Sequence, residues 1–266
     1  LEGESPAGGQ YAMTWVLGVG LITLLAGCSV RIRMAEGRSL LGEERVASAR
    51  QMILVVTPGW NSIGGQLSRY ERSAGMNWRR LGGSIPVVVG RNGLAWADEY
   101  AGAPGRSGDP IKREGDGRSP AGIFTLGSAF GYEPAAALGR LTIDYLQVTK
   151  SWECVDDCKS SFYNQLTDGS QHPGRDWASS EAMRRDDDYY RLGVVINHNF
   201  PNPVACRGSC IFLHIWEGPE LGTVGCTAMA PGPMEQILRW LDRSASPVLV
   251  QLTETNRREL KWIPDK

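Results

Sequence analysis

The chain has 266 residues, of which 42% are hydrophobic, which is enough for one large domain or two small ones. Its 28 basic and 29 acidic side chains give a formal net charge of -1, so no overall positive field favours nucleic-acid binding, and no nucleic-acid partner is expected. The 33 glycines and 15 prolines indicate many turns and favour a mainly β architecture.

The first predicted element is an export signal. Residues 14–25 (TWVLGVGLITLL) are apolar and uncharged, but the run is shorter than the about 20 residues that span a bilayer. It continues into small residues that end at Cys28, which is typical of a secretory cleavage site; the alternative is a short buried or anchoring helix. The LAGC sequence resembles the bacterial lipobox. That resemblance implies lipidation of Cys28, and Ser29 implies sorting to the outer membrane. We therefore expect a signal peptide over 1–28 and a polar tether over 29–50.

Short apolar runs between turn signals predict a sheet in the remainder of the chain. The predicted strands are 51–57, 85–90, 122–126, 141–148, 192–197, 210–216 and 248–253. In 210–216, alternation places Phe212, His214 and Trp216 on one face of the strand. The intervening residues 149–191 are polar and predict an excursion from the sheet, with a solvated charge run at 184–188.

One helix is predicted after these strands. Pro233 suits a first helical position, and apolar residues follow it at helical spacing: Met234, Ile237, Leu238 and Leu241. The apolar face of this helix is expected to pack on the sheet.

The cysteines divide into pairs and one remaining thiol. With Cys28 assigned to lipid, Cys154 and Cys158 form one C-x3-C pair, and Cys206 and Cys210 form another. In an oxidising compartment such pairs favour disulfides, and proximity favours bonding within each pair, although four cysteines allow three pairings. A four-cysteine zinc site is the alternative. Either assignment leaves Cys226 as a free thiol.

Cys226 is the candidate nucleophile. It lies between Gly225 and Thr227, and Gly225 is expected to permit a backbone conformation that a Cβ would forbid and to let a carbonyl group approach. Amides of Gly225 and Cys226 would then stabilise an oxyanion. A thiol nucleophile requires a base, and the chain has three histidines. His172 is expected at the surface and His198 in a turn, whereas His214 lies on a strand and is nearest in sequence to the thiol.

Two segments carry a family resemblance. Residues 214–229 (HIWEGPELGTVGCTAM) resemble the signature of the L,D-transpeptidase (YkuD-type) catalytic domain, with matches at His214, Gly218, Thr223, Gly225 and Cys226. The block GDGRSPAGIFTLG at 115–127 resembles a second segment of that family, and TPGWNSIGGQL at 57–67 is also similar. Val224 stands where many members have a second histidine. The resemblance covers about 51–253 and leaves 254–266 as a C-terminal tail.

The resemblance implies a sandwich-like, mainly β domain with few helices and no metal or organic cofactor. It implies that Cys226 is the nucleophile, that His214 is the general base and that the carbonyl of Ile215 orients the imidazole. Gly225 would belong to the oxyanion loop. The expected substrate contacts are Thr223, Thr227, Gly218 and Trp216.

The implied activity is acyl transfer on peptidoglycan stem tetrapeptides through a thioester, in an envelope protein held at the membrane by a lipid anchor. The partners would be the stem peptides of the cell wall. One alternative is an L,D-carboxypeptidase, in which water resolves the same acyl-enzyme. The other is a non-catalytic peptidoglycan-binding lipoprotein in which Cys226 is inert.

Overall fold

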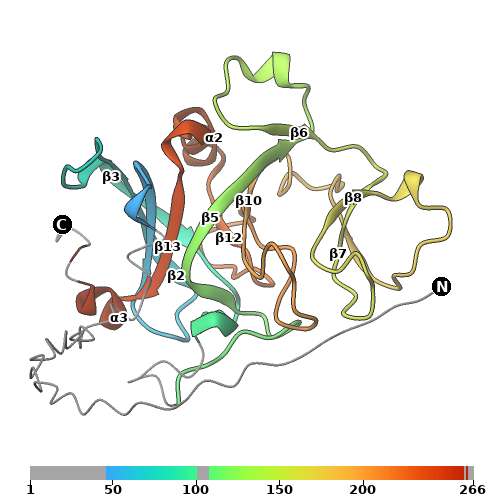
Figure 1. The fold of residues 1–266 in the computed structure, drawn as a ribbon, viewed down its shortest axis with the longest axis horizontal. Coiled ribbons are helices and arrows are strands. Elements are labelled where there is room, and N and C mark those ends of the chain that lie inside the picture. Colours follow the sequence, from blue (N-terminus) through green and yellow to red (C-terminus); the bar gives the residue numbers. More distant parts are fainter. Residues whose placement is uncertain (1–45, 101–107, 261, 263–266) are drawn as a thin grey trace, which may run out of the picture. The chain divides into compact units, whose positions relative to one another are not determined.

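The computed structural model describes residues 46–100, 108–260 and 262 (Figure 1). The predicted signal peptide, Cys28 and most of the predicted tether lie outside these residues. The last part of the expected tether belongs to the folded unit, because Val46 is 3% exposed and Ala49 is 1% exposed within the hydrophobic core.

The described part of the chain is mainly β, as predicted. Its main sheet has ten strands, in the spatial order β10-β11-β12-β3-β2-β1-β13-β5-β4, with β6 beside β5. A further pairing of β10 with β5 joins strands from the two sides of this order. The strands are β1 (Gln51–Thr57), β2 (Gly64–Glu71), β3 (Arg79–Val88), β4 (Leu94–Trp96), β5 (Ser119–Gly131), β6 (Tyr145–Gln147), β10 (Leu192–Ile196), β11 (Phe212–Ile215), β12 (Thr227–Met229) and β13 (Val248–Thr253).

A second, three-stranded sheet forms within the polar excursion, where the sequence predicts no strand. It consists of β7 (Trp152–Val155), β8 (Leu166–Asp168) and β9 (Ser180–Ala182), with β7 in the centre. Figure 1 shows this sheet in yellow on the side of the molecule away from α3. The strands are short and mostly half-buried, so they lack the long apolar runs that predicted the main sheet.

The helices lie mostly near the C-terminal end of the described chain. Helix α2 (Pro231–Trp240) confirms the predicted helix but begins earlier, because Pro231 occupies the first turn. Helix α3 (Glu254–Glu259) stands where the sequence predicts a tail, and the Thr253 side chain caps it by accepting from Asn256 N–H. Short 3-10 turns span Asp98–Tyr100, Ala135–Leu138, Gly169–Gln171 and Arg243–Ala245.

The strand β11 separates two hydrophobic clusters. Ile211, Leu213 and Ile215 belong to the larger core, whereas Phe212 belongs to a second cluster that contains Cys226. This confirms the predicted alternation along 210–216. The consequence for function is that His214 points to the same side of the sheet as the thiol.

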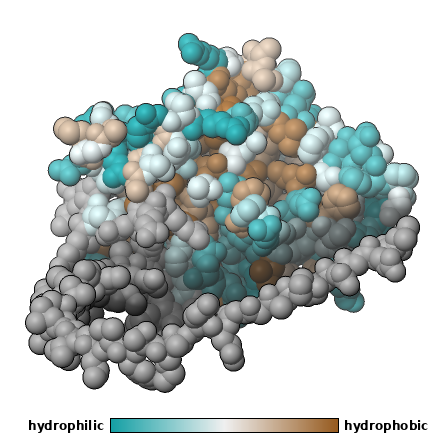
Figure 2. All heavy atoms as spheres, in the orientation of Figure 1, coloured by the Kyte–Doolittle hydropathy of each residue, from teal (hydrophilic) through white to brown (hydrophobic). Residues whose placement is uncertain are grey.

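On the face drawn in Figure 2, hydrophobic side chains are interspersed with hydrophilic ones. Among the described residues, no helix combines the length and the apolar character that crossing a bilayer requires.

The four paired cysteines form two disulfides, but the predicted pairing is wrong. Cys154 bonds to Cys210 and Cys158 bonds to Cys206, so neither bond closes a C-x3-C pair. With all four thiols oxidised, these residues do not provide the alternative zinc site. Cys226 is the free cysteine of the described chain, as predicted. The disulfides indicate an oxidising compartment outside the cytoplasm.

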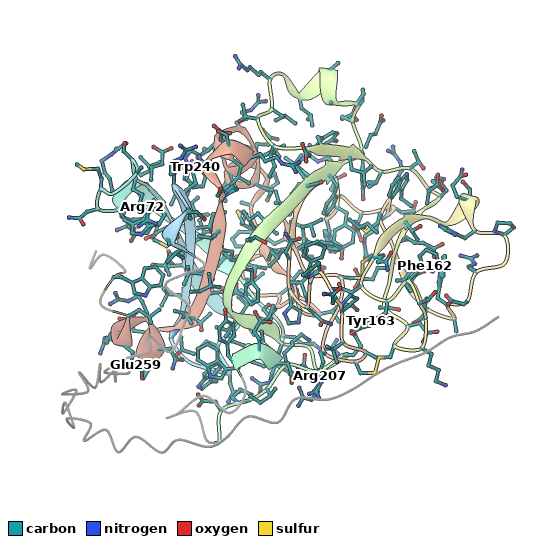
Figure 3. All side chains as sticks on the ribbon, in the orientation of Figure 1. Arg72, Phe162, Tyr163, Arg207, Trp240 and Glu259 are labelled. Carbon is teal, nitrogen blue, oxygen red and sulfur yellow. A yellow bond between two sulfur atoms is a disulfide. The ribbon has the colours of Figure 1, made fainter. Side chains whose placement is uncertain are left out.

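Both disulfides join the excursion to the loop that precedes β11. Tyr163 of the excursion and Arg207 of the loop lie in the same region in Figure 3, and the neighbouring Gly208 N–H donates to Tyr163 Oη at 3.1 Å. Proximity along the chain failed as a guide because folding brings residues separated by 56 and 48 positions to Cα–Cα distances of 5.9 and 5.2 Å.

Peptide mapping of unreduced protein is expected to find Cys154 linked to Cys210 and Cys158 linked to Cys206. Alkylation of the unreduced protein in denaturant, before digestion, should label Cys226 and no other cysteine between residues 46 and 262, because the other four thiols are oxidised. The same digest after reduction provides the control, with all five cysteines labelled. A peptide that links Cys154 to Cys158 would contradict this connectivity.

Candidate active site around Cys226

Cys226 lies immediately before β12, at the edge of a cavity. Its side chain is 7% exposed, and its sulfur accepts a hydrogen bond from Phe212 N–H at 3.3 Å. The thiol itself donates to the carbonyl of Cys210 at 3.4 Å. Burial raises the pKa of this thiol above its usual range, and the nearby Glu181 charge adds to the rise, so the resting group is a neutral thiol.

Two hydroxyl groups hold the backbone of Cys226 in place. Its carbonyl accepts hydrogen bonds from Ser119 Oγ at 2.8 Å and from Thr223 Oγ1 at 2.6 Å. The Ser119 hydroxyl also accepts from Gly90 N–H at 2.8 Å. Ser119 opens β5 and lies in the second family-like block, so the two blocks meet in space at the thiol. Sequence reasoning used Ser119 only as part of that block and gave it no role in the site.

The structure corrects two expectations about Gly225. Its φ angle is not in the positive region, so its backbone conformation is not one that a Cβ would forbid. A Cβ at this position would instead come within 3.3 Å of the Arg118 carbonyl oxygen, which makes the contact tight. The Gly225 N–H donates to Thr223 Oγ1 at 3.1 Å, so this amide is already occupied and does not face an oxyanion.

His214 lies on β11, two residues beyond the amide that contacts the thiol. Its Nδ1 is 2.8 Å from the carbonyl oxygen of Ile215, and because a carbonyl only accepts, Nδ1 carries the proton. Burial lowers the pKa of His214 to about 4, against the opposing effect of the Ile215 carbonyl. The imidazole is therefore neutral near pH 7, with Nε2 unprotonated.

Cys226 and His214 line the same cavity, which has a volume of about 330 Å³. Trp216 and Thr223 also line it, as expected of substrate contacts, although the Thr223 hydroxyl is held by the Cys226 carbonyl. The rim carries two exposed apolar side chains, Val224 at 62% and Leu221 at 52%. The charged residues in the lining are Lys112, Glu114, Asp156, Glu181, Arg185 and Glu217.

Two of the expected substrate contacts do not line this cavity. Thr227 is 0% exposed, and its hydroxyl donates to Gln251 Oε1 at 2.7 Å, so it supports the core and cannot contact a substrate. Gly218 lies in the turn after β11, where its carbonyl accepts from Leu221 N–H, and it is not part of the lining. A motif position alone does not say which residues line the cavity.

The other two histidines lie away from the thiol. His172 is half-buried in the smaller sheet, where Nε2 is 2.9 Å from Thr167 Oγ1 and the ring packs against Phe162. His198 is 2% exposed, and its Nε2 donates to the Arg207 carbonyl oxygen at 3.0 Å. Neither ring lines the cavity of Cys226.

The excursion contributes residues to the site that the sequence did not reveal. Tyr190 is 6% exposed, and its ring lies edge-on to that of His214 at a centroid distance of 5.1 Å. Its hydroxyl donates to Glu181 Oε2 at 2.7 Å. Arg185, within the charge run expected to be fully solvated, lies 5.4 Å from the Tyr190 ring centroid and lines the cavity. These positions carry no motif, so no signal in a single sequence identified them.

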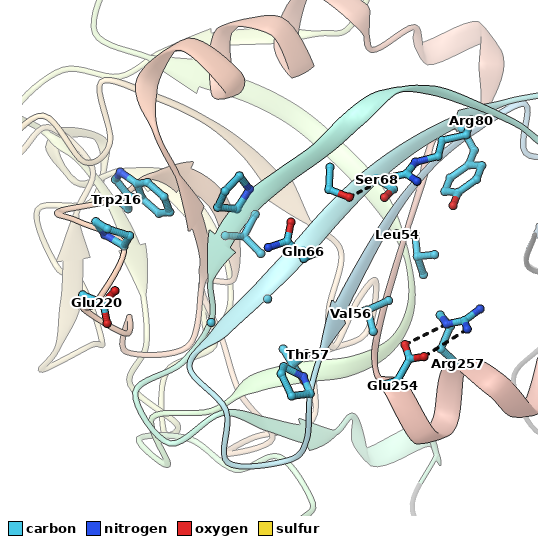
Figure 4. A pocket seen from close by; sticks show the side chains of 18 residues that line it. Leu54, Val56, Thr57, Gln66, Ser68, Arg80, Trp216, Glu220, Glu254 and Arg257 are labelled. Carbon is cyan, nitrogen blue, oxygen red and sulfur yellow. Dashed lines mark hydrogen bonds and ion pairs between the residues drawn. The ribbon is translucent and has the colours of Figure 1, made fainter. Parts of the chain in front are cut away.

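A larger groove begins next to the thiol cavity, and Trp216 lines both (Figure 4). The groove has a volume of about 920 Å³ and runs over β1, β2 and β3. Glu220 lies near the end marked by Trp216, and the ion pair between Glu254 and Arg257, at 3.1 Å, lies at the other end. Trp216 is therefore the residue that the thiol cavity and the groove share.

Comparison with known proteins does not assign the chain to a family. The chain matches no family model, and no curated protein is significantly similar to it in sequence.

Proposed function

We propose that this protein is a cysteine-dependent L,D-transpeptidase that acts on peptidoglycan stem tetrapeptides through a thioester. The observation that carries the proposal is the shared cavity of Cys226 and His214, with His214 Nδ1 held by the Ile215 carbonyl. In the proposal, these residues are the nucleophile, the base and the group that orients the base, which together would activate the thiol. The family-like segments at 115–127 and 214–229 supply the substrate class, and the fold would be the sandwich-like domain of that family.

In the proposed reaction, Nε2 of His214 takes the Cys226 proton as the sulfur attacks the carbonyl that precedes the terminal D-alanine. The Cys226 amide, rather than that of Gly225, donates to the oxyanion. Collapse of the tetrahedral intermediate breaks the C–N bond, and the proton on His214 passes to the departing amine of D-alanine. An amine from a second stem then attacks the thioester and restores the thiol.

Trp216 supports a path for the peptide in this proposal. Because it lines both the thiol cavity and the larger groove, the remainder of a stem peptide can extend from the reacting carbonyl over β2 and β3. The oxidised cysteines and the lipobox-like segment support the proposed location in the cell envelope. We propose attachment by a lipid at Cys28, probed by labelling with a fatty-acid analogue.

One observation favours a different class of function. Cys226 is buried, and its thiol pKa is raised, which is also what an inert core cysteine would show. In that case the domain would bind peptidoglycan without reacting with it. The distinction is a matter of reactivity: an activated Cys226 is alkylated near neutral pH, and an inert one is not.

The test is incubation of the purified protein with a defined stem tetrapeptide, with and without an amine acceptor. We expect release of D-alanine and, with the acceptor present, formation of a new amide. Release of D-alanine with the acceptor left unused would favour the L,D-carboxypeptidase alternative. Absence of both products and of an acyl-enzyme by mass spectrometry would refute the proposed function.

A further inference from the structure

A further cavity adjoins that of the thiol, and Cys210 and Ile211 line both. It lies between β6 and β10 of the main sheet and β7 and β8 of the smaller sheet (Figure 1). The disulfide Cys154–Cys210 forms part of its wall. Its volume of about 720 Å³ is within the range of about 300–1,000 Å³ that is usual for ligand sites. The mechanism proposed above gives this cavity no role.

The described residues that line this second cavity include no aspartate, glutamate, lysine or arginine, whereas the thiol cavity has six such residues. His198 also borders it, but the ring is 2% exposed and is neutral near pH 7, because burial lowers its pKa to about 4. A charged ligand would lose its hydration here without gaining a counter-charge. The second cavity, called the uncharged cavity below, therefore suits a neutral ligand, while the charged groups of a stem peptide suit the thiol cavity.

Two aromatic side chains give the uncharged cavity flat apolar surface. Trp152 of β7 is half-buried, and Phe200 is 62% exposed. The loop that carries Phe200 is held by the side chain of Asn199, which accepts from Val204 N–H at 2.8 Å. The same side chain donates to the carbonyls of Val204 and Gly208 at 2.9 and 3.1 Å. Hydrogen bonds therefore fix the backbone next to an exposed ring on the wall of a cavity, where the ring is available to a ligand.

Neutral hydrogen-bonding groups without protein partners line the same cavity. Among the described residues, the Ser128 hydroxyl, the Trp152 indole N–H and Asn197 Oδ1 form no hydrogen bond. The Asn197 side chain is nevertheless fixed, since its Nδ2 donates to Thr125 Oγ1 at 2.9 Å. A Cβ at Gly127 would lie 3.0 Å from Asn197 Oδ1, so this glycine leaves room beside the acceptor. The uncharged cavity thus offers both donors and acceptors beside its apolar surface.

We propose that the uncharged cavity binds a neutral carbohydrate chain. A sugar ring has a face of C–H bonds that packs on an aromatic ring, and an edge of hydroxyl groups that donate and accept hydrogen bonds. Trp152 and Phe200 contact the C–H faces, while Ser128, Asn197 and the indole N–H of Trp152 bind the hydroxyl groups. A purely apolar lipid chain would leave these polar groups without partners. The ligand class is argued from the lining of the cavity and does not depend on the thiol chemistry.

Titration calorimetry of the unmodified protein with a soluble oligosaccharide tests this inference. The probe is N-acetylated chitotetraose, which is uncharged, and its deacetylated form, measured in mildly acidic buffer where its amines are protonated, is the matched ligand control. We expect saturable binding of the N-acetylated probe. The deacetylated form should bind at least about tenfold more weakly, because the lining has no carboxylate to pair with its ammonium groups.

Three variants locate the binding. Phe200→Ala removes an exposed ring and should weaken binding of the N-acetylated probe by about fivefold or more, as expected for the loss of an aromatic contact. Trp152→Phe keeps an aromatic ring but removes the indole N–H, and should also weaken binding by about fivefold. Met76→Ala is the matched control: Met76 is 64% exposed and lies outside the cavity, so binding should be unchanged.

Absence of saturable binding up to millimolar probe would overturn the inference, and so would equal binding of the two oligosaccharides or unchanged binding in folded Phe200→Ala. A sugar-free stem tetrapeptide is titrated in parallel. If Phe200→Ala weakened binding of the tetrapeptide and not of the oligosaccharide, the cavity would be a peptide site and the inference would be wrong. Folding of each variant is checked by thermal unfolding and by the two intact disulfides.

The titration does not depend on turnover. Failure of oligosaccharide binding therefore leaves the transpeptidase proposal standing, whereas absence of D-alanine release refutes that proposal and leaves the carbohydrate site intact. If both hold, the uncharged cavity would keep the sugar chain of the cell wall beside the thiol while its stem peptide reacts, because Cys210 and Ile211 line both cavities.

Discussion

Replacing Cys226 with alanine is expected to abolish release of D-alanine from the stem tetrapeptide. The thioester cannot form without the sulfur, and removal of a catalytic nucleophile usually lowers kcat by ~10³-fold or more. The measurement is D-alanine release under saturating tetrapeptide, together with intact-mass detection of the acyl-enzyme. Cys226→Ser should behave similarly, because the weaker hydroxyl nucleophile lacks a base strong enough to ionise it in this buried setting.

The fold should tolerate Cys226→Ala, so that a loss of activity reports the missing sulfur and not unfolding. The sulfur forms hydrogen bonds with the Phe212 amide and the Cys210 carbonyl, and the Cys226 carbonyl remains held by Ser119 and Thr223 in the alanine variant. Thermal unfolding and the disulfide map should match those of the unmodified protein. Turnover by folded Cys226→Ala would show that the nucleophile is assigned wrongly.

Replacing His214 with alanine is expected to change both the rate of acylation and its dependence on pH. In the unmodified protein, His214 must be neutral to accept the thiol proton, and its pKa is lowered to about 4. The contribution of neutral His214 to kcat/KM should therefore be complete well above pH 4. It should be lost as the pH falls through about 4, where the imidazole becomes protonated. Loss of a general base typically costs about 10²–10⁴-fold.

In His214→Ala the fall of kcat/KM through about pH 4 should disappear, because no imidazole is left to become protonated. The remaining activity should instead rise with pH towards the raised pKa of the Cys226 thiol, because only the ionised sulfur then attacks without the imidazole. The measurement is kcat/KM for acylation across the pH range in which the protein stays folded, with iodoacetamide alkylation of Cys226 followed in parallel. The apparent values belong to the coupled pair, since the two groups share one cavity.

Two histidine variants serve as controls. His198→Ala removes an equally buried ring whose pKa is also lowered to about 4 by burial, but which lies outside the cavity of the thiol. His172→Ala removes the half-buried ring of the smaller sheet. Both should keep the pH profile of the unmodified protein. If His214→Ala kept that profile and lost only stability, His214 would be a packed strand residue, and His198 would become the next candidate.

The strands and the thiol–histidine pair were predictable because each has a local signal. The run Gln51–Thr57 is apolar at its centre and matches β1 to the residue, since a strand that is buried on both faces needs apolar side chains on both faces. The 210–216 alternation placed Phe212 and His214 on one face of the strand, and this is the face that the structure turns towards Cys226. The sequence does not predict β2, because Gly64, Gly65 and the exposed polar residues of this strand interrupt the alternation of apolar and polar side chains.

The disulfide connectivity and the Tyr190–Glu181 pair could not be predicted for the same physical reason. Each joins the excursion to a distant loop or strand, and nothing in the local pattern reports such contacts. The role of Gly225 was misread because a glycine next to a reactive residue suggests a positive φ, whereas here the constraint is the approach of the Arg118 carbonyl.

The bond between Cys154 and Cys210 has a consequence for when the protein becomes competent. This disulfide links β7, which pairs with β9, to Cys210, whose carbonyl contacts the Cys226 sulfur. The finished pocket therefore depends on oxidation of these two cysteines. A newly synthesised copy in a reducing cytosol would lack that fastening. The pocket around the thiol would then be completed only in an oxidising compartment, which under the proposed function is also where the stem peptides lie.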